Sequence, residues 1–114
     1  MIYHGTKSVT TAGIAVPLSA TRVPLSWITF FPLQSLAHVA NAGQIRIGGK
    51  PDISENGGTP GVTTGIPSGS GMPLNPGDSG VAWPMMAPQP LDLSTIYLDS
   101  DVSADGVQFV YARP

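Results

Sequence analysis

Three aspartates near the C-terminus are the first residues whose spacing suggests chemistry. Asp99, Asp101 and Asp105 lie close together and are followed by Gly106. Carboxylates at alternate positions are typical of calcium loops, but an EF-hand also needs a glycine at its sixth position and a distant bidentate glutamate. The sixth position counted from Asp99 is Ala104, and no glutamate follows. We therefore expect an acidic turn between strands, with positive φ at its Asp105-Gly106 end, and keep a weak cation site of another kind as the alternative.

The two histidines, His4 and His38, have no further ligands clustered around them. A zinc site needs three or four ligands, and the chain contains no cysteine, which excludes thiolate metal sites, disulfides and a cysteine nucleophile. We expect His4 to be a flexible terminal residue and His38 to lie in a strand or turn. The segment Gly48-Gly49-Lys50 lacks the spacing and the Lys-Ser/Thr pair of a phosphate loop. The sequence therefore predicts no metal and no cofactor.

One short segment suggests nucleophilic catalysis. Gly77-Asp78-Ser79-Gly80 resembles the nucleophile segment of chymotrypsin-like serine proteases, and Leu36-Ala37-His38 faintly resembles their histidine segment. The serine would be the nucleophile and the histidine its base, but a buried carboxylate must orient the imidazole, and no such segment lies between them. Val81 stands where that family has a second glycine, and 114 residues are too few for its double barrel. We expect a β-turn with Pro76 at its first position, and no enzyme.

The composition restricts both the fold and the partners. Only 11% of the residues are charged, against about 25% in an ordinary soluble domain. With 14 glycines and 12 prolines in 114 residues, long uninterrupted helices are excluded, and with them helix bundles, coiled coils and doubly wound α/β folds. Hydrophobic residues make 41% of the chain, which argues against disorder. The surface must therefore be unusually neutral and easily buried against another protein.

The same counts argue against two classes of partner. Five Lys and Arg residues cannot form a phosphate-binding stripe, so we expect no nucleic acid. No apolar run approaches the roughly 20 residues that cross a bilayer, so we expect no membrane. The start Met1-Ile2-Tyr3-His4-Gly5 lacks the layout of a secretory signal. We expect a protein made in a cytoplasm and not exported by a cleaved signal.

Short alternating apolar runs predict an all-β chain that forms a single domain over residues 1–114. The first two runs suggest a hairpin through Ala12-Gly13, with Pro17 at a sheet edge. The run from Ser26 suggests a central strand buried on both sides and ending near His38, although 33–40 also fits a short helix. About seven or eight strands suffice for an antiparallel, jelly-roll-like β-sandwich. In the strand over 44–47, Gln44 and Arg46 lie on the face opposite to that of the two isoleucines. The expected strands cover 7–11, 14–19, 26 to about 38, 44–47, 80–83, 96–98 and 107–111.

A long segment and a proline-rich segment are the expected contact elements. Residues 48–71 hold eight glycines and three prolines, too few apolar groups to compensate for ordering, so we expect one long exposed Gly/Pro-rich loop. The segment 84–90 is expected to be polyproline-like, before a turn capped by Asp92 or Ser94. Most aromatic residues are expected in the core. The candidate partner-contact residues are Trp83, Pro84, Met85, Met86, Ile53, Val62 and Ile66.

The order of these segments also carries a resemblance. The succession Ile45-Arg46-Ile47-Gly48, Pro76-Gly77-Asp78-Ser79, Leu91 to Asp99 and Asp105 to Tyr111 resembles small tailed-bacteriophage virion proteins. Thr10 to Leu18 fits their opening hairpin. The resemblance implies a β-sandwich or jelly-roll that decorates the capsid surface of a virion. It would bind the major capsid protein and itself, as a dimer or trimer, and cement the mature head. Alternatives are another phage structural component, at the head–tail junction or in the tail or fibre, and a carbohydrate- or receptor-binding module.

Overall fold

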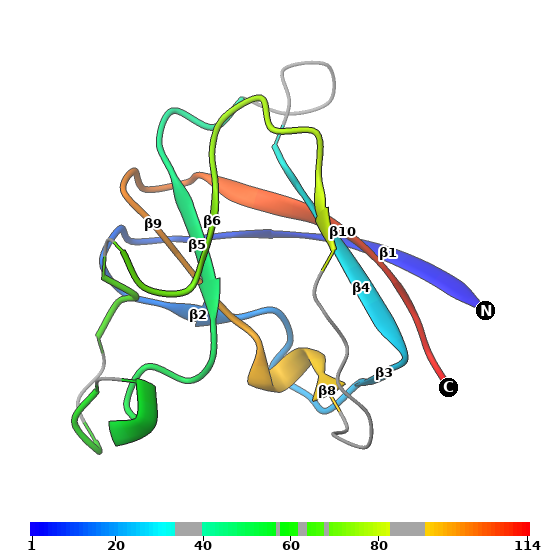
Figure 1. Ribbon diagram of the computed structural model, residues 1–114, viewed down its shortest axis with the longest axis horizontal. Coiled ribbons are helices and arrows are strands. Elements are labelled where there is room, and N and C mark those ends of the chain that lie inside the picture. Colours follow the sequence, from blue (N-terminus) through cyan, green and yellow to red (C-terminus); the bar gives the residue numbers. More distant parts are fainter. Residues whose placement is uncertain (34–39, 57, 62–63, 68, 83–90) are drawn as a thin grey trace.

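Two four-stranded antiparallel sheets face one another in the computed structural model (Figure 1), which describes residues 1–33, 40–56, 58–61, 64–67, 69–82 and 91–114. This confirms the all-β class and the antiparallel sandwich. Sheet A has the order β1 (Ile2–Ser8), β10 (Gly106–Ala112), β4 (Trp27–Pro32), β7 (Val81–Ala82). Sheet B has the order β2 (Val16–Pro17), β9 (Tyr97–Ser100), β5 (Ile45–Gly48), β6 (Met72–Leu74). A small ribbon joins β3 (Pro24–Leu25) to β8 (Leu91–Asp92), and two 3-10 turns, η1 (Ser54–Asn56) and η2 (Leu93–Thr95), complete the described elements.

The core lies between the two sheets and follows the period of two that strands impose. Ile28 and Phe30 of β4 are fully buried, as is Val107 of β10. Ile47 of β5 and Leu98 of β9 meet them from sheet B. These residues belong to one hydrophobic cluster drawn from both sheets. The alternation that the sequence shows in 107–111 is therefore confirmed as an inner and an outer face.

The expected opening hairpin is wrong. β1 begins at Ile2 and pairs with β10 along its whole length, from Ile2 opposite Ala112 to Ser8 opposite Gly106. β2 pairs with β9 in the other sheet, because the turn after β1 carries the chain from sheet A to sheet B. His4 is a strand residue opposite Val110 rather than a flexible terminal residue. Pro17 does lie in an edge strand, since β2 ends sheet B.

The strand over the aromatic run is central but differs from expectation in two ways. β4 lies between β10 and β7, yet only one of its faces is buried, and Trp27 is 39% exposed. It ends at Pro32 rather than near His38. Beyond it the Asn41 side chain takes over the pairing with β10: its Nδ2 donates to the Gly106 carbonyl (2.8 Å), and its Oδ1 accepts from the Gly106 amide (2.9 Å). The choice between helix and strand for 34–39 lies outside the described residues.

Two turns are displaced from their expected positions. The turn before β7 starts at Asn75, whose carbonyl accepts from the Asp78 amide (3.1 Å). Pro76 is therefore its second residue, and Gly77, at φ +82°, its third, which is the arrangement of a type II turn. In the acidic turn before β10, the positive φ belongs to Ala104 (+74°) and not to Asp105-Gly106.

The C-terminal elements otherwise follow the sequence closely. Asp92 caps η2, as expected, by accepting from the Ser94 amide (2.8 Å). β5 and β10 lie within a residue or so of their expected bounds, and β9 starts one residue late and extends to Ser100. The described residues form ten strands rather than seven or eight, because the short strands β3, β6 and β8 were not expected.

Candidate interaction surfaces

The outer face of sheet B carries a buried ion pair that the sequence pattern does not reveal. Arg46 of β5 lies opposite Asp99 of β9, and they are 5% and 1% exposed. The guanidinium donates from Nε to the Ile66 carbonyl (2.5 Å) and from Nη1 to Asp101 Oδ1 (2.7 Å), while Nη2 lies 3.7 Å from Asp99 Oδ2. Arg46 lies opposite the isoleucine face, as the alternation predicts, and the long loop covers the face that it occupies.

Asp99 holds two loops against the sheet. Its Oδ1 accepts from the Gly13 amide (2.9 Å) and the Ser100 amide (2.8 Å), and its Oδ2 accepts from the Ile66 amide (2.8 Å). The turn after β1 is also joined to the long loop by the Ala15 amide, which donates to the Thr64 carbonyl (3.2 Å). A buried carboxylate is tolerated when its oxygens accept several hydrogen bonds in this way.

The long Gly/Pro-rich loop is thus only partly the exposed segment expected. No described residue between β5 and β6 belongs to a strand, but the part around Ile66 lies on the outer face of sheet B. Ile66 is 6% exposed and packs beside Gly48 and Gly71. Its side chain is therefore not available to a partner in this structure, which corrects its assignment as a contact residue. Ile53 is 39% exposed, and Val62 lies outside the described residues.

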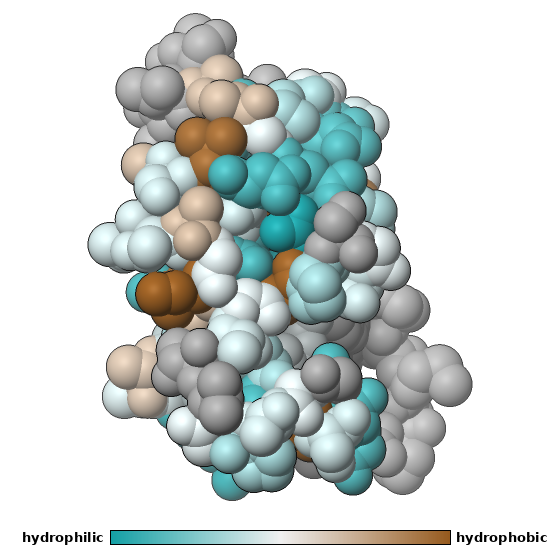
Figure 2. Space-filling model, turned by 90° about the vertical axis from the view of Figure 1, so that its left-hand side faces the viewer, coloured by the Kyte–Doolittle hydropathy of each residue, from teal (hydrophilic) through white to brown (hydrophobic). Residues whose placement is uncertain are grey.

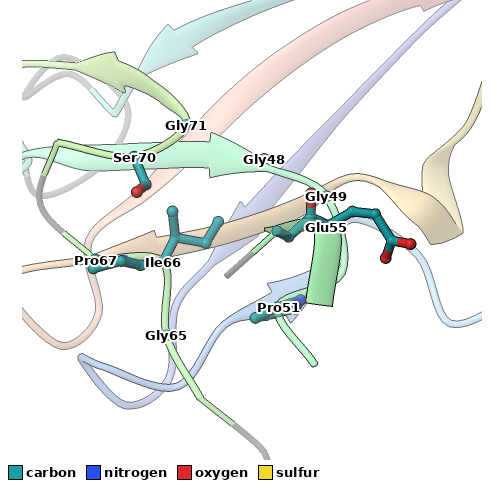
Figure 3. Close-up of a pocket in the computed structure, with 10 residues that line it drawn as sticks. Gly48, Gly49, Pro51, Glu55, Gly65, Ile66, Pro67, Ser70 and Gly71 are labelled. Atoms are coloured by element: carbon teal, nitrogen blue, oxygen red, sulfur yellow. The ribbon is translucent and has the colours of Figure 1, made fainter. Parts of the chain in front are cut away.

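The loop encloses a hollow of about 380 Å³ beside the end of β5 (Figure 3). An adjoining hollow of about 450 Å³ reaches the Arg46–Asp99 pair. The carboxylate of Glu55 points away from Ile66 (Figure 3). Arg46 and Asp99, which line the second hollow, already bind each other and the backbone at Ile66. The first hollow is lined by Gly48, Gly49, Pro51, Glu55, Asn56, Gly65, Ile66, Pro67, Ser70 and Gly71.

The three C-terminal aspartates do not share a centre. The guanidinium of Arg46 occupies the space between Asp99 and Asp101 that a cation would need. Asp105 turns elsewhere and accepts from the amides of Ala42 (3.0 Å) and Gly43 (2.8 Å). Across the described part of the chain, no group of three or more His, Cys, Asp or Glu residues could hold a metal ion.

Only some of the remaining predicted site residues belong to the part of the chain that the structure describes. Ser79 is exposed and follows the turn before β7, while its expected base His38 lies outside the described residues. The contact candidates Trp83, Pro84, Met85 and Met86 also lie outside them.

The outer face of sheet A is the surface that sequence reasoning missed. The strand registers place one set of side chains from β1, β10, β4 and β7 on this face. All five Lys and Arg and all seven Asp and Glu residues lie in the described part of the chain, and none occupies a position on this face. The face comprises Ile2, His4, Thr6, Ser8, Gln108, Val110, Ala112, Trp27, Thr29, Phe31 and Ala82.

Every residue of this uncharged face is at least partly exposed to solvent. Ile2 is 66% and Trp27 39% exposed, the largest apolar groups on it besides the half-buried Phe31. The side of the molecule at the left in Figure 1 differs: Figure 2 shows hydrophilic residues gathered there in one broad area, with hydrophobic residues as separate spots. Lys, Arg, Asp and Glu residues are therefore absent from the outer face of sheet A, whereas exposed apolar residues such as Ile53 and Val102 also occur away from it.

Comparison with known proteins adds no identification. No protein family, no curated protein and no solved structure matches the chain. No helix among the described residues is long and apolar enough to cross a membrane.

Proposed function

We propose that this protein is a structural, non-enzymatic component of a tailed-phage virion, a decoration or cement protein on the outer surface of the mature head. The observation that carries the proposal is the uncharged outer face of sheet A. A face without ionic groups can be buried against another protein without the desolvation penalty of unpaired charges. Exposed aromatic and aliphatic groups such as Trp27 and Ile2 are the kind that dominate binding energy at interfaces.

The rest of the molecule supports the same assignment. The charged groups on the outer face of sheet B bind one another and the backbone of the long loop, which covers them. The neutral outer face of sheet A is therefore the face that remains available to a partner. The proposed partners are the major capsid protein and further copies of this chain, in a dimer or trimer. A protein that binds only the mature lattice stabilises it by mass action, and many copies on a repeating shell add avidity.

The proposal is tested by binding to expanded and unexpanded heads of the phage that encodes the chain. Trp27→Lys places a charge on the outer face of sheet A, and we expect it to weaken co-sedimentation with expanded heads at least about tenfold. Val102→Lys is the matched control because Val102 is exposed to the same extent, 39%, after β9 and away from that face, whereas Ile53→Lys tests the predicted contact of the loop. Equal binding of the wild-type protein to both kinds of head contradicts the cement role. Loss of binding with Ile53→Lys alone moves the contact to the loop.

The apolar segment between prolines stays a proposed contact on sequence grounds. Its residues Trp83 to Met86 lie outside the described part of the chain. Trp83→Ala combined with Met85→Ala should weaken attachment to heads while circular dichroism stays unchanged. Loss of folding would instead assign these residues to the core.

A second function is favoured by one observation only. Trp27 offers a partly exposed aromatic ring, which a carbohydrate- or receptor-binding module would use to stack against sugars. Binding to an array of glycans, lost in Trp27→Ala, would establish this alternative, and an array without signal would remove it. Imaging particles with and without the protein separates a head position from one at the head–tail junction, tail or fibre.

A further inference from the structure

The first strand leaves one of its edges without a partner in the described structure. β1 ends sheet A, and its seven residues make it, with β10, the longest strand. All of its described pairing is with β10. An exposed edge of this length presents a row of backbone amides and carbonyls that can template pairing with another chain.

The hydrogen bonds next to β1 show which residues face that edge. The Val9 amide donates to the Asp105 carbonyl (2.8 Å), in register with the β1–β10 pairing. Successive strand residues direct their backbone groups to opposite sides, so Lys7, Gly5 and Tyr3 also face β10. The other edge of β10 agrees, since the Leu33 amide donates to the Gly106 carbonyl (3.3 Å). The residues whose backbone groups face the free edge are therefore Ile2, His4, Thr6 and Ser8.

We propose that this free edge binds the same edge of a second copy of the chain, antiparallel about a two-fold axis, so that two A sheets become one continuous sheet. This inference rests on the proposed function, in that it names the interface of the homo-oligomer. A two-fold contact must be self-complementary. The edge is self-complementary about its middle residue, Gly5.

Centring the axis on Gly5 uses all four outward-facing residues. Ile2 then lies opposite Ser8 of the second copy, and His4 opposite Thr6, both as hydrogen-bonded pairs. The two Gly5 residues form a non-hydrogen-bonded pair, where Cα atoms approach to about 4.5 Å. A glycine suits that position, and the ring of Phe109 fills the space of its missing side chain, 2.7 Å from where a Cβ would lie.

The charges of the strand fit this register. Lys7 is the strand's single Lys, Arg, Asp or Glu residue, and a lysine on an edge commonly prevents pairing. Here it is half-buried on the core side and comes opposite Tyr3 of the second copy, whose ring attracts a cation. The two Lys7 positions lie about 14 Å apart across the axis, beyond the Debye length of about 8 Å at physiological ionic strength. The pairing therefore keeps the two Lys7 side chains apart, although it brings each of them towards Arg113 of the other copy, whose Cζ lies 5.9 Å from the centroid of the Tyr3 ring.

The decisive variant is Thr6→Pro, measured by sedimentation velocity. Proline removes an amide that faces the free edge and leaves the ladder with β10 intact, as edge strands allow. At about 100 µM, where a complex of micromolar Kd is populated, we expect a dimer for the wild-type protein. We expect the Kd of Thr6→Pro to rise at least about 100-fold. The control Thr6→Val keeps the amide and should remain a dimer.

A charge-swap pair tests the register and does not depend on how proline is tolerated. His4→Lys with Thr6→Lys sets like charges opposite one another across the axis and should give a monomer. His4→Lys with Thr6→Glu sets opposite charges there and should restore the dimer. A dimer that survives the double-lysine variant overturns the proposal.

The same proteins separate this proposal from the proposed function. A wild-type monomer at about 100 µM overturns the dimer, and if Thr6→Pro then loses binding to heads, the edge pairs with a capsid strand instead. A wild-type dimer that fails to bind heads leaves the dimer standing and contradicts the function. A monomeric Thr6→Pro protein that still binds heads supports both the edge dimer and a capsid contact elsewhere.

Discussion

At the scale of single residues, Asp99 is the group on which the outer face of sheet B depends. It accepts hydrogen bonds from three amides and pairs with the buried Arg46. Asp99→Asn leaves that guanidinium with only the half-exposed Asp101 as a carboxylate partner. Because breaking a buried ion pair from one side leaves an uncompensated charge, we expect a loss of about 3 kcal/mol in the free energy of unfolding. Urea denaturation measures it.

The neighbouring carboxylate provides the control. Asp101 also binds Arg46, at 2.7 Å, but its side chain is 54% exposed. Water replaces much of what it contributes, so Asp101→Asn should cost less than about 1 kcal/mol. Equal losses for the two variants would mean that the burial of Asp99 does not determine its contribution.

Single residues also show why this surface could not be read from the sequence. The alternation of Ile45 and Ile47 with Gln44 and Arg46 correctly predicts two faces of one strand. It cannot predict that a loop covers the polar face, because the partners of Arg46 lie 20 to 55 positions away in the sequence. A lone Arg between two isoleucines in a chain with so few charges was the available signal.

At the scale of elements, the long loop depends on glycine for its close approach to sheet B. A Cβ on Gly65 would lie 2.1 Å from Asp99 Oδ2 and 2.7 Å from the Gly13 carbonyl oxygen. Gly65→Ala must therefore displace the loop or the carboxylate, and we expect a destabilisation of about 1–3 kcal/mol, with faster proteolysis between β5 and β6. Thermal unfolding and limited digestion with a glutamate-specific endopeptidase, whose target Glu55 is the single glutamate of the sequence and lies in the loop, measure the two effects.

Gly48 is the matched glycine at the start of the same loop. A Cβ there would meet Ile66 at 3.4 Å, an ordinary contact, so Gly48→Ala should cost less than about 1 kcal/mol. If both alanine variants unfold and are digested like the wild-type protein, the loop is not held at Gly65.

The positions of strands and turns were predicted well where a local sequence pattern is enough to determine them. β5, β7, β10 and the η2 cap follow from alternation and from a capping aspartate. The pairing of strands was not predictable in this way: the segments 7–11 and 14–19 are adjacent in sequence, yet the chain crosses between sheets at Gly13. The turn at Asn75 was misplaced by one residue, because Pro76 fits the first position of a turn less well than the second, where its fixed φ is required.

At the scale of the whole molecule, the two sheets differ in the charge of their outer faces. Sheet B neutralises its ionic groups internally, and sheet A turns a face without Lys, Arg, Asp or Glu to the outside. That face is invisible in the sequence, because its residues come from β1, β4, β7 and β10 and never form a continuous run. The low charge content, in contrast, is evident from the composition alone and correctly indicated a surface with few charges.

This division predicts how attachment to heads should respond to salt. Ionic contacts weaken as the Debye length shortens from about 10 Å at 0.1 M to about 3 Å at 1 M, whereas salt does not screen the burial of apolar surface. A contact made through the outer face of sheet A should therefore keep its Kd within about threefold over that range. Titration of heads at the two salt concentrations measures it.

The Trp27→Lys variant, measured at the same two salt concentrations, is the comparison for the wild-type protein. With a charge on the outer face, whatever binding remains should become dependent on salt, because salt screens the interaction of the new ammonium with charged groups on the shell. A wild-type Kd that weakens more than about tenfold between the two concentrations would place the ionic groups of sheet B or its loop in the contact. The uncharged face of sheet A would then have no part in the contact with the head, although pairing through β1 would still extend it across the two-fold axis.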